Sequence, residues 1–401
     1  MTTKNNIPAG YKDSAVGIIP QEWEVKRLGN IAKCFSGGTP KSESEEMYGG
    51  TIPFIRSGEI HRNKTALFLT DDGLRKSSAK MVDVGDLIFA LYGANSGDCA
   101  ISQINGAINQ AILCIRSSSV INPFLHPYLE LQKDRYIAKY LQGGQGNLSG
   151  EIVSSYTIPV PPLVEQRKIA EILGVWDEAI EKQSRLIEKL ELRKRTLMQR
   201  LFTGRTRLSG FNAPWQKVKL GEIFKERNET KCEHLPLLSI TAERGVILQS
   251  ESDKKDTSND DKSKYKRICP NDIGYNTMRM WQGRSALSAM EGIVSPAYTI
   301  VTPKVGIDPL FTSELIKQPR VVYDFWTHSQ GLVGDTLNCK FHDFSQVKVA
   351  IPSLPEQKAI AEVLTTADYE IASHRKKLDA LRQQKRGLMQ QLLTGKTRVK
   401  I

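Results

Sequence analysis

The sequence predicts an α+β protein in which two mixed α/β domains are separated by two long antiparallel α-helices, a coiled coil, with an internal two-fold repeat. Three observations support this class. The segment VPPLVEQRKIAEIL at 160–173 is almost repeated by IPSLPEQKAIAEVL at 351–364. Each copy opens a run of about 40 residues with helical periodicity. The remaining sequence alternates short β-type runs with turn signals.

The repeat sets the predicted domain boundaries. Glu165 matches Glu356, 191 positions later, and the same offset relates the closing phrases RTLMQRLFTGRTR and RGLMQQLLTGKTR. A second similarity, between EWEVKRLGNI and PWQKVKLGEI, precedes each copy, but the globular stretches share little else in sequence. We therefore predict a first domain at 1–160, a first helix at 161–204, a second domain at 205–351, and a second helix with its tail at 352–401.

Each repeated segment has the pattern of a coiled-coil helix. Apolar residues recur at alternating spacings of four and three, flanked by Glu, Lys and Arg, and no proline interrupts the run. At 1.5 Å per residue each helix would be roughly 60 Å long. The predicted seam consists of Ile169, Leu173, Trp176, Ile180, Ile187, Leu190, Leu197 and Leu201 in the first helix, and of Ile360, Leu364, Ile371, Leu378, Leu381, Leu388 and Leu392 in the second.

Such a seam needs a buried partner, and the economical partner for each helix is the other helix. The second domain connects the end of the first helix to the start of the second. Because the ends of a compact domain often lie close together, we expect an antiparallel pair. Polar residues at matched seam positions, Gln183 with His374 and Lys194 with Lys385, have two interpretations. The simpler one is a solvated edge of the seam, and the other is control of helix register.

The predicted helix ends agree with these limits. Ser353 and Glu356 fit a capping box, which is weaker in the first copy because Pro162 stands in place of Ser353. Gly204 and Gly395 stand where a left-handed C-cap belongs. The phrase TGKTR resembles the end of a phosphate-binding loop, but the first glycine of GxxxxGKT is missing and the phrase ends a helix. A helix C-cap is therefore the better interpretation.

The two globular stretches have the mixed pattern of α+β domains. β-type runs include TIPFI, DLIFALY and AILCI in the first stretch, and YTIVT and VKVAI in the second. Helical patches lie at 123–141 and 308–318. The very polar segment 250–267 predicts an exposed loop. The glycine-rich segment 142–150 predicts a plain flexible turn, because it lacks the strand-then-helix context of a nucleotide-binding loop.

Composition favours a cytoplasmic protein with an anionic partner. The 401 residues carry a net charge of +12, for which nucleic acid is the usual partner and an inert basic surface is the alternative. The six cysteines form no CxxC pair and have no histidine at metal-ligand spacing, so neither a disulfide framework nor a metal site is predicted. The sequence has no apolar signal region and no run of membrane-spanning length, so no membrane partner is expected.

Candidate DNA contacts are basic, amide or aromatic residues on turn-rich segments. Arginine pairs bidentately with guanine, and asparagine or glutamine with adenine, in the major groove. A structural or phosphate-facing role is the alternative for each residue. The candidates are Arg56, Ser57, Tyr92, Asn95, Asn109 and Gln110 in the first domain, and Arg279, Trp281, Gln282 and Arg284 in the second.

No catalytic residue is predicted. The sequence has no metal-dependent nuclease carboxylate cluster, no GxSxG and no HExxH. Asn122-Pro-Phe is not the NPP[YF] of amino-methyltransferases, and no cofactor-binding loop accompanies it. The sequence therefore favours a non-catalytic protein.

One family combines these features. The pattern IPxPPLxEQ leading into a long helix that ends near TG[RK]TR resembles the specificity subunit of type I restriction–modification enzymes. YKDSAVGIIPQEW, IPFIRSGEI, GGQGNLSG and YNTMRMWQG are also similar to segments of that family. The resemblance covers nearly the whole chain, and its most specific element is the doubled EQxxIAE[IV]L segment.

The resemblance implies a separate role for each part of the chain and for each partner subunit. Each of two target-recognition domains would read one half of a bipartite site in double-stranded DNA, while the helix pair sets the spacer and docks two modification subunits. S-adenosylmethionine would bind to those partners and no cofactor to this chain, and restriction and motor subunits would complete the complex. Two rival classes stay open: a DNA methyltransferase with disguised motifs, and a coiled-coil scaffold without sequence-specific DNA binding.

Overall fold

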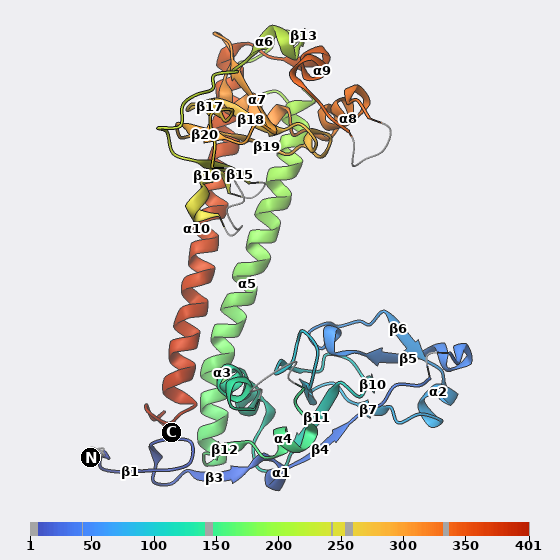
Figure 1. Ribbon diagram of the computed structural model, residues 1–401. Helices are drawn as coiled ribbons and strands as arrows, with labels where there is room; N and C mark the ends of the chain where they lie inside the picture. Colours follow the sequence, from blue (N-terminus) through green and yellow to red (C-terminus); the bar gives the residue numbers. More distant parts are fainter. Residues whose placement is uncertain are drawn as a thin grey trace. The chain divides into compact units, whose positions relative to one another are not determined.

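The computed structural model describes residues 7–41, 43–140, 147–241, 244–252, 260–331 and 337–400. The chain divides into two compact units, of which unit 1 contains residues 1–184 with 376–401 and unit 2 contains residues 185–375. The long helices α5 (Leu163–Phe202) and α10 (Leu354–Leu392) each contribute to both units (Figure 1). No helix in the described ranges is long and apolar enough to cross a membrane.

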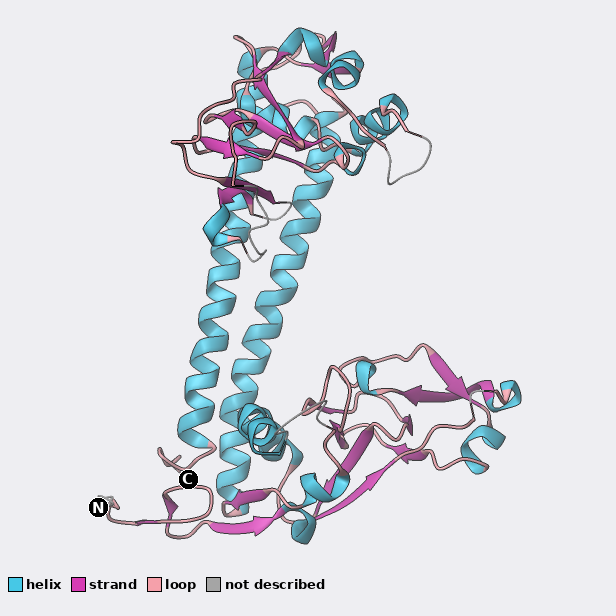
Figure 2. Cartoon of the chain, in the orientation of Figure 1, coloured by secondary structure: helices cyan, strands magenta, loops and turns pink. Residues whose placement is uncertain are grey.

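Unit 1 contains two four-stranded sheets with short helices between their strands (Figure 2). One sheet has the strand order β4-β11-β8-β9 and is antiparallel throughout. The other has the order β6-β5-β10-β7, in which β10 and β5 are parallel. The strands are β4 (Ala32–Ser36), β5 (Tyr48–Ile55), β6 (Leu67–Leu69), β7 (Lys80–Val82), β8 (Leu87–Ala90), β9 (Cys99–Ile101), β10 (Gly106–Ile108) and β11 (Ile112–Ser117).

The core of unit 1 joins one of these sheets to the long helices. Trp23, Phe124 and Tyr156 are fully buried in one cluster, which also contains Ile169 of α5 and Leu393 just after α10.

Two small ladders, β1-β2 and β12-β3, lie outside the four-stranded sheets. The other elements are β1 (Tyr11–Lys12), β2 (Ile19–Pro20), β3 (Glu24–Arg27), β12 (Thr157–Val160), α1 (Leu28–Ile31), η1 (Glu45–Met47), η2 (Ser57–Glu59), α2 (Asp71–Arg75), α3 (Asn122–Tyr140) and α4 (Gly150–Ser154).

Unit 2 contains a four-stranded antiparallel sheet of order β14-β21-β18-β19 and three two-stranded ladders, β13-β22, β15-β16 and β17-β20. The strands are β13 (Gln216–Lys219), β14 (Phe224–Glu226), β15 (Leu238–Thr241), β16 (Gly245–Leu248), β17 (Lys266–Ile268), β18 (Ile273–Asn276), β19 (Ser285–Leu287), β20 (Gly292–Val294), β21 (Tyr298–Pro303) and β22 (Lys348–Ile351). The helices are α6 (Leu220–Ile223), η3 (Gln249–Glu251), η4 (Met280–Gln282), α7 (Pro309–Leu315), α8 (Pro319–His328) and α9 (Phe341–Gln346).

The helix pair is antiparallel, as predicted. In unit 1 the start of α5, with Ile169 and Leu173, shares a core with Leu392 at the end of α10. In unit 2 the end of α5, with Leu201, shares a core with Ile360 at the start of α10. Every predicted seam residue is buried or half-buried, including Gln183 and His374, so the periodicity identified the buried face of both helices.

The matched seam lysines form matched ion pairs. In unit 2 the Lys194 ammonium lies 2.6 Å from a carboxylate oxygen of Asp368, and in unit 1 Lys385 lies 2.6 Å from Asp177. The lysine side chains are 18% and 14% exposed and their aspartate partners are 59% exposed, so both pairs lie at the edge of the seam with the lysine partly covered. Since the same contact recurs 191 residues later, both halves of the pair are held in one register.

The repeated glutamate ties each helix to the segment that follows the other helix. At the start of α5, the buried Glu165 carboxylate accepts hydrogen bonds from Nε1 of Trp23 at 2.9 Å and from Nε of Arg398 at 2.7 Å. At the start of α10, Glu356 accepts hydrogen bonds from Nε and Nη2 of Arg207 at 2.6 and 2.7 Å. Both arginines end the TG[RK]TR phrase. The repeated phrases are therefore the two sides of one contact, which is made once in each unit.

The repeated glutamine next to it anchors the following domain helix. Oε1 of Gln166 accepts the backbone N–H of Ile121, just before α3, at 2.9 Å. Oε1 of Gln357 accepts the N–H of Asp308, just before α7, at 2.9 Å. Each Nε2 donates to the carbonyl five residues earlier. The repeated Glu-Gln pair thus binds the start of each long helix to neighbouring segments of its unit.

Some local predictions need correction. The capping box at Ser353 and Glu356 is wrong, because the Glu356 carboxylate bonds to Arg207 instead of the helix start. The C-caps are confirmed, since Gly204 and Gly395 have φ of 66° and 73°. The helical patch at 308–318 is confirmed over the shorter range of α7, Pro309–Leu315, and a separate helix, α8, begins just after the patch at Pro319.

Two predicted loops lie partly outside the described ranges. Residues 253–259 of the 250–267 segment and residues 142–146 of the glycine-rich segment are not described. At its far end the 250–267 segment is ordered, because Tyr265 is buried and β17 begins at Lys266. The glycine-rich segment ends at Gly150, the first residue of α4, and the side chain of the preceding Ser149 caps this helix.

Candidate nucleic-acid interface

The globular domains contain a second repeat that side-chain similarity does not reveal. Strands β7 to β11 and β17 to β21 correspond at a constant offset of 186 residues, with β7, β8, β9, β10 and β11 matching β17, β18, β19, β20 and β21. The sheet orders β4-β11-β8-β9 and β14-β21-β18-β19 are equivalent. The expectation that the globular stretches share little beyond their first residues is therefore wrong for the backbone.

Specific polar contacts repeat with the strands. Oδ2 of Asp86, just before β8, accepts the backbone N–H of Asp83 at 2.8 Å, and Oδ2 of Asp272, just before β18, accepts that of Cys269 at 2.8 Å. Ser102 and Ser288 each donate a hydroxyl to the carbonyl two residues later. Both domains therefore share an aspartate that accepts a backbone N–H of the turn before a central strand.

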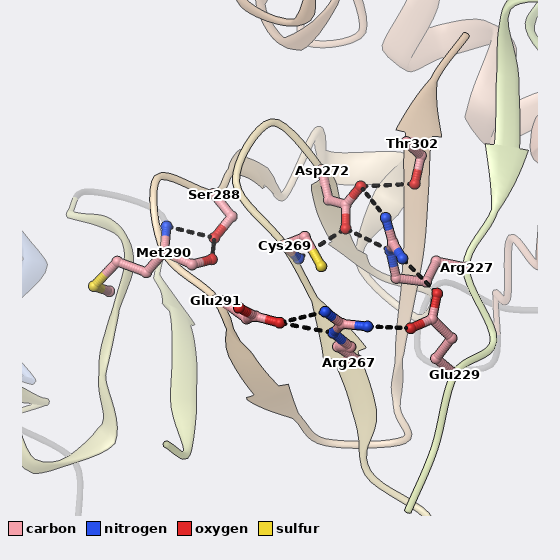
Figure 3. Close-up of polar contacts among 9 residues, drawn as sticks. All are labelled: Arg227, Glu229, Arg267, Cys269, Asp272, Ser288, Met290, Glu291 and Thr302. Atoms are coloured by element: carbon pink, nitrogen blue, oxygen red, sulfur yellow. Dashed lines mark hydrogen bonds and ion pairs between the residues drawn. The ribbon is translucent and has the colours of Figure 1, made fainter. Parts of the chain in front are cut away.

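In unit 2 this aspartate lies at the centre of a charged network (Figure 3). The Asp272 carboxylate also accepts hydrogen bonds from Nε of Arg227 at 2.7 Å and from the hydroxyl of Thr302 at 2.6 Å. Arg227 pairs with Glu229, and Arg267 lies between Glu229 and Glu291. In unit 1 the equivalent carboxylate, Asp86, pairs with Arg116. Burial raises the pKa of Asp86, but the hydrogen bonds from Arg116 and from the Asp83 N–H lower it more, so this carboxyl has a pKa below its ordinary value.

Six of the ten predicted DNA contacts fall in equivalent loops of the two domains. Residues 91–98 join β8 to β9 and contain Tyr92 and Asn95, while residues 277–284 join β18 to β19 and contain all four candidates of the second domain. Gly97 and Gly283, 186 residues apart, both have positive φ, of 84° and 72°. Asn95 and Trp281 occupy the same position in the two loops.

One backbone framework holds both loops. The N–H of Leu91 donates to the carbonyl of Ala111 at 2.8 Å, and the N–H of Thr277 donates to that of Ala297 at 3.4 Å. The N–H of Leu148 then donates to the Leu91 carbonyl, as the N–H of Cys339 does to that of Thr277. The two loops therefore share a fixed base and differ in the side chains they present.

In unit 1 the candidates come together from three segments. Nδ2 of Asn95 donates to the carbonyl of Ser57 at 3.2 Å, and the N–H of Asn109 donates to the carbonyl of Ile55 at 3.2 Å. Gln110 is exposed and accepts a hydrogen bond from the hydroxyl of Thr39. Arg56, Ser57, Tyr92, Asn95, Asn109 and Gln110 therefore belong to one group of adjoining turns.

Several of these side chains already have structural contacts. Arg56 pairs with the buried Glu59 carboxylate at 3.2 Å, and Glu59 also accepts the N–H of Ala66 at 3.0 Å. Burial raises the pKa of Glu59, but the contacts from Arg56 and Ala66 outweigh it, so its pKa lies below the ordinary value. Oδ1 of Asn109 accepts the N–H of Ala111. DNA contact by these residues remains a prediction.

In unit 2 the loop has a buried anchor and an exposed edge. Met280 is fully buried, Arg279 and Trp281 are half-buried, and Gln282 and Arg284 are exposed. Nε1 of Trp281 donates to the carbonyl of Met278 at 3.0 Å, which fixes the indole ring. Gln282 and Arg284 are thus the two candidates of this loop whose side chains are most available to a ligand.

A basic hollow adjoins this loop. It has a volume of about 610 Å³ and reaches the base of the loop at Thr277. Oδ1 of Asn338 is buried there without a hydrogen-bond partner in the described structure. The lining includes Lys266, Lys340 and His342, with Glu226 as its single carboxylate, which lies 4.0 Å from the Lys266 ammonium. Lysine, histidine and amide groups around a hollow suit a phosphate oxygen. No motif indicated this hollow in the sequence.

Among the described residues, no group of three or more His, Cys, Asp or Glu side chains could hold a metal ion. The cysteines in these ranges include buried Cys99, Cys114 and Cys339. Burial raises the pKa of the Cys114 and Cys339 thiols to about 12, which suppresses the reactive thiolate. These thiols are packing groups.

Comparison with known proteins assigns the family. The model of the type I restriction modification DNA specificity domain matches residues 20–192 and 320–383, together more than half of the chain. The chain belongs to this family. As a member of the type I specificity family, it is 25% identical to the type I restriction enzyme MjaVIII specificity subunit of Methanocaldococcus jannaschii, over 95% of this chain and 94% of that protein.

Other family members are similar over part or all of the chain. The type I restriction enzyme EcoR124I/EcoR124II specificity subunit of Escherichia coli is 24% identical over 42% of this chain and 44% of its own length. The S subunit of the type I restriction-modification system from M. genitalium has the same fold, with a TM-score of 0.56, 16% identity and coverage of 100% of this chain and 99% of that one. A chain from a study of complex assembly in the type I R-M system has a TM-score of 0.60 and 17% identity, covering 94% of this chain and 99% of that one.

Proposed function

We propose that this chain is the specificity subunit of a type I restriction–modification complex, and that each globular domain reads one half of a bipartite site in double-stranded DNA. One observation carries this proposal. The loops at 91–98 and 277–284 have the same backbone framework but present different side chains. A duplicated frame with unlike contents suits two readers of two different sequences.

The same proposal assigns the remaining parts. The helix pair sets the spacing of the two half-sites and docks two modification subunits, and restriction and motor subunits join the full complex. S-adenosylmethionine binds to the modification subunits, while this chain is non-catalytic, holds no cofactor and acts in the cytoplasm. The net charge of +12 supports contact with the DNA backbone. S-adenosylmethionine binding by the purified chain alone would favour the alternative of a methyltransferase with disguised motifs.

The test is methylome sequencing of cells that express the chain with its modification partner. We expect methylation at a site with two specified halves separated by unspecified base pairs. Replacing residues 1–160 with the same region of a relative should change one half-site and leave the other unchanged. Methylation without sequence preference, as a mere scaffold would give, or a change in both halves after the exchange, would contradict the proposal.

Substitutions in the second loop should affect only one half-site. We expect Gln282→Ala or Arg279→Ala to weaken binding to the cognate site by roughly 5- to 150-fold, the range for a lost bidentate base contact. Binding to a duplex with a scrambled second half-site should not change. Lys217→Ala, an exposed basic residue on β13, is the matched control. An equal loss on every duplex would instead indicate a phosphate contact or a structural role.

A further inference from the structure

Helix α8 of unit 2 exposes two large aromatic side chains. Tyr323 and Trp326 are 60% and 48% exposed, and their ring centroids lie 5.6 Å apart. The opposite side of the same helix is fully anchored, because Val321 and Phe325 are buried and the Phe325 ring stacks on Phe344 at 5.3 Å. The exposed pair is therefore a second apolar surface on a helix whose core-facing side is already satisfied. Paired exposed aromatic rings of this kind are typical of interaction sites.

This helix supports the candidate reading loop. A Cβ atom added at Gly283 would lie 3.0 Å from Cγ2 of Val322, so α8 packs directly against the end of η4. Val322 immediately precedes Tyr323 in the helix. The aromatic pair is thus carried by the helix that packs on the loop containing Gln282 and Arg284.

The charges around the pair favour an anionic ligand. Arg320 on α8 and Arg284 on the loop are exposed, and His328 ends the helix. The helix carries a single acidic residue, Asp324, which is half-buried. Aromatic rings flanked by arginine suit a DNA backbone, because a sugar packs on the ring while arginine contacts phosphate.

The equivalent helix of the first domain lacks such a pair. The second half of α3 packs on Gly97, whose added Cβ would lie 3.0 Å from Cδ1 of Ile137, as α8 packs on Gly283. Its aromatic residues point into the domain instead: Tyr136 stacks on the buried Tyr156 at 3.8 Å, and Tyr140 lies 5.6 Å from the same ring. An aromatic surface beside the loop therefore belongs to the second domain.

We propose that α8 extends the DNA-contacting surface of the second domain, and that Tyr323 and Trp326 contact duplex DNA through their ring faces. This inference rests on the proposed function and adds two contact residues to it. It assigns the pair to DNA and not to a protein subunit, because α8 packs on the candidate loop and carries the exposed Arg320. Its contribution is confined to the second half-site.

The test measures binding of the chain, in complex with its modification partner, to a fluorescent duplex that carries the site found by methylome sequencing. We expect Trp326→Ala and Tyr323→Ala each to weaken binding by about tenfold, within the range found when an aromatic contact residue of an interface is truncated to alanine. Trp326→Phe should restore most of the loss because it keeps a ring. Val305→Ala, which removes an exposed apolar side chain from the turn after β21, should bind like the parent.

The outcomes separate the two levels of the proposal. Unchanged binding by the Trp326→Ala and Tyr323→Ala variants would overturn the role of α8 while leaving the proposed function intact. Failure of these variants to co-purify with the modification subunit would also overturn it, because the pair would then be a protein-docking surface. If the parent complex shows no preference for its methylated site over a scrambled duplex, the proposed function fails, and the role of α8 fails with it.

Discussion

Replacing Glu165 with alanine should lower the free energy of unfolding by about 3 kcal/mol, the usual cost of leaving a buried charge-assisted contact without one partner. The Glu165 carboxylate is fully buried and accepts hydrogen bonds from Trp23 and Arg398. Without it, the indole N–H of the fully buried Trp23 loses its acceptor. Arg398 also loses the contact that holds its segment against the start of α5.

Urea unfolding followed by circular dichroism measures this loss. Glu165→Gln should cost less, because the amide oxygen can still accept the indole N–H. Glu171→Ala is the matched control, since it removes an exposed glutamate one and a half turns further along α5 whose ion pair with Lys168 is on the surface. Exposed pairs contribute about 0–1 kcal/mol. If Glu165→Ala and Glu171→Ala unfold at the same urea concentration, the buried contact has little value for stability.

Lengthening both long helices by one heptad should lengthen the spacer between the half-sites by about three base pairs. Seven residues add roughly 10 Å at 1.5 Å per residue, and DNA rises about 3.4 Å per base pair along a strand. A heptad turns the helix surface by only about 20°, so the seam is preserved. The insertions belong after Arg185 in α5 and after Lys376 in α10, because this placement leaves the Lys194–Asp368 and Lys385–Asp177 pairs intact.

Methylome sequencing with the modification partner gives the spacer directly. Both half-site sequences should stay the same, and methylation should slow, because the added base pairs also rotate one half-site about the DNA axis. A heptad inserted in α5 alone is the control, and it should destabilise the chain by breaking the seam register. An active variant with both insertions and the original spacer would show that the helices do not set the spacing.

The sequence predicted the parts of the fold that depend on periodicity. Seam residues such as Leu173 and Ile371 repeat at helical spacing and are buried, and Gly204 and Gly395 end their helices in the left-handed conformation. The capping box failed because Glu356 has a stronger partner in Arg207, 149 residues away in sequence. Local pattern analysis cannot detect such a distant competitor.

The candidate site was only partly predictable, for a different physical reason. The two loops match through backbone conformation, seen in Gly97 and Gly283, and through a carboxylate at Asp86 and Asp272, while most side chains between them differ. Comparison of sequences detects shared residue types. The framework of the two loops consists of main-chain hydrogen bonds, which many different residue types can form, so the comparison does not detect it. Tyr323 and Trp326 were not among the predicted contacts, since the predicted helical patch ended at 318 and α8 begins at Pro319.

The contacts of Arg207 and Arg398 have a consequence for chain topology. In unit 2, Arg207 and Trp215 are joined by eight peptide bonds. In unit 1, the equivalent Arg398 and Trp23 come from opposite parts of the sequence and are held together by non-covalent contacts, which include the Glu165 carboxylate, the Arg398–Glu22 ion pair at 2.7 Å and the packing of Gly395 on Pro20. Two equivalent junctions thus form, one covalent and one not. The two domains are therefore connected at both junctions, by a peptide segment at one and by non-covalent contacts at the other. The structure itself does not require one domain to precede the other in the sequence.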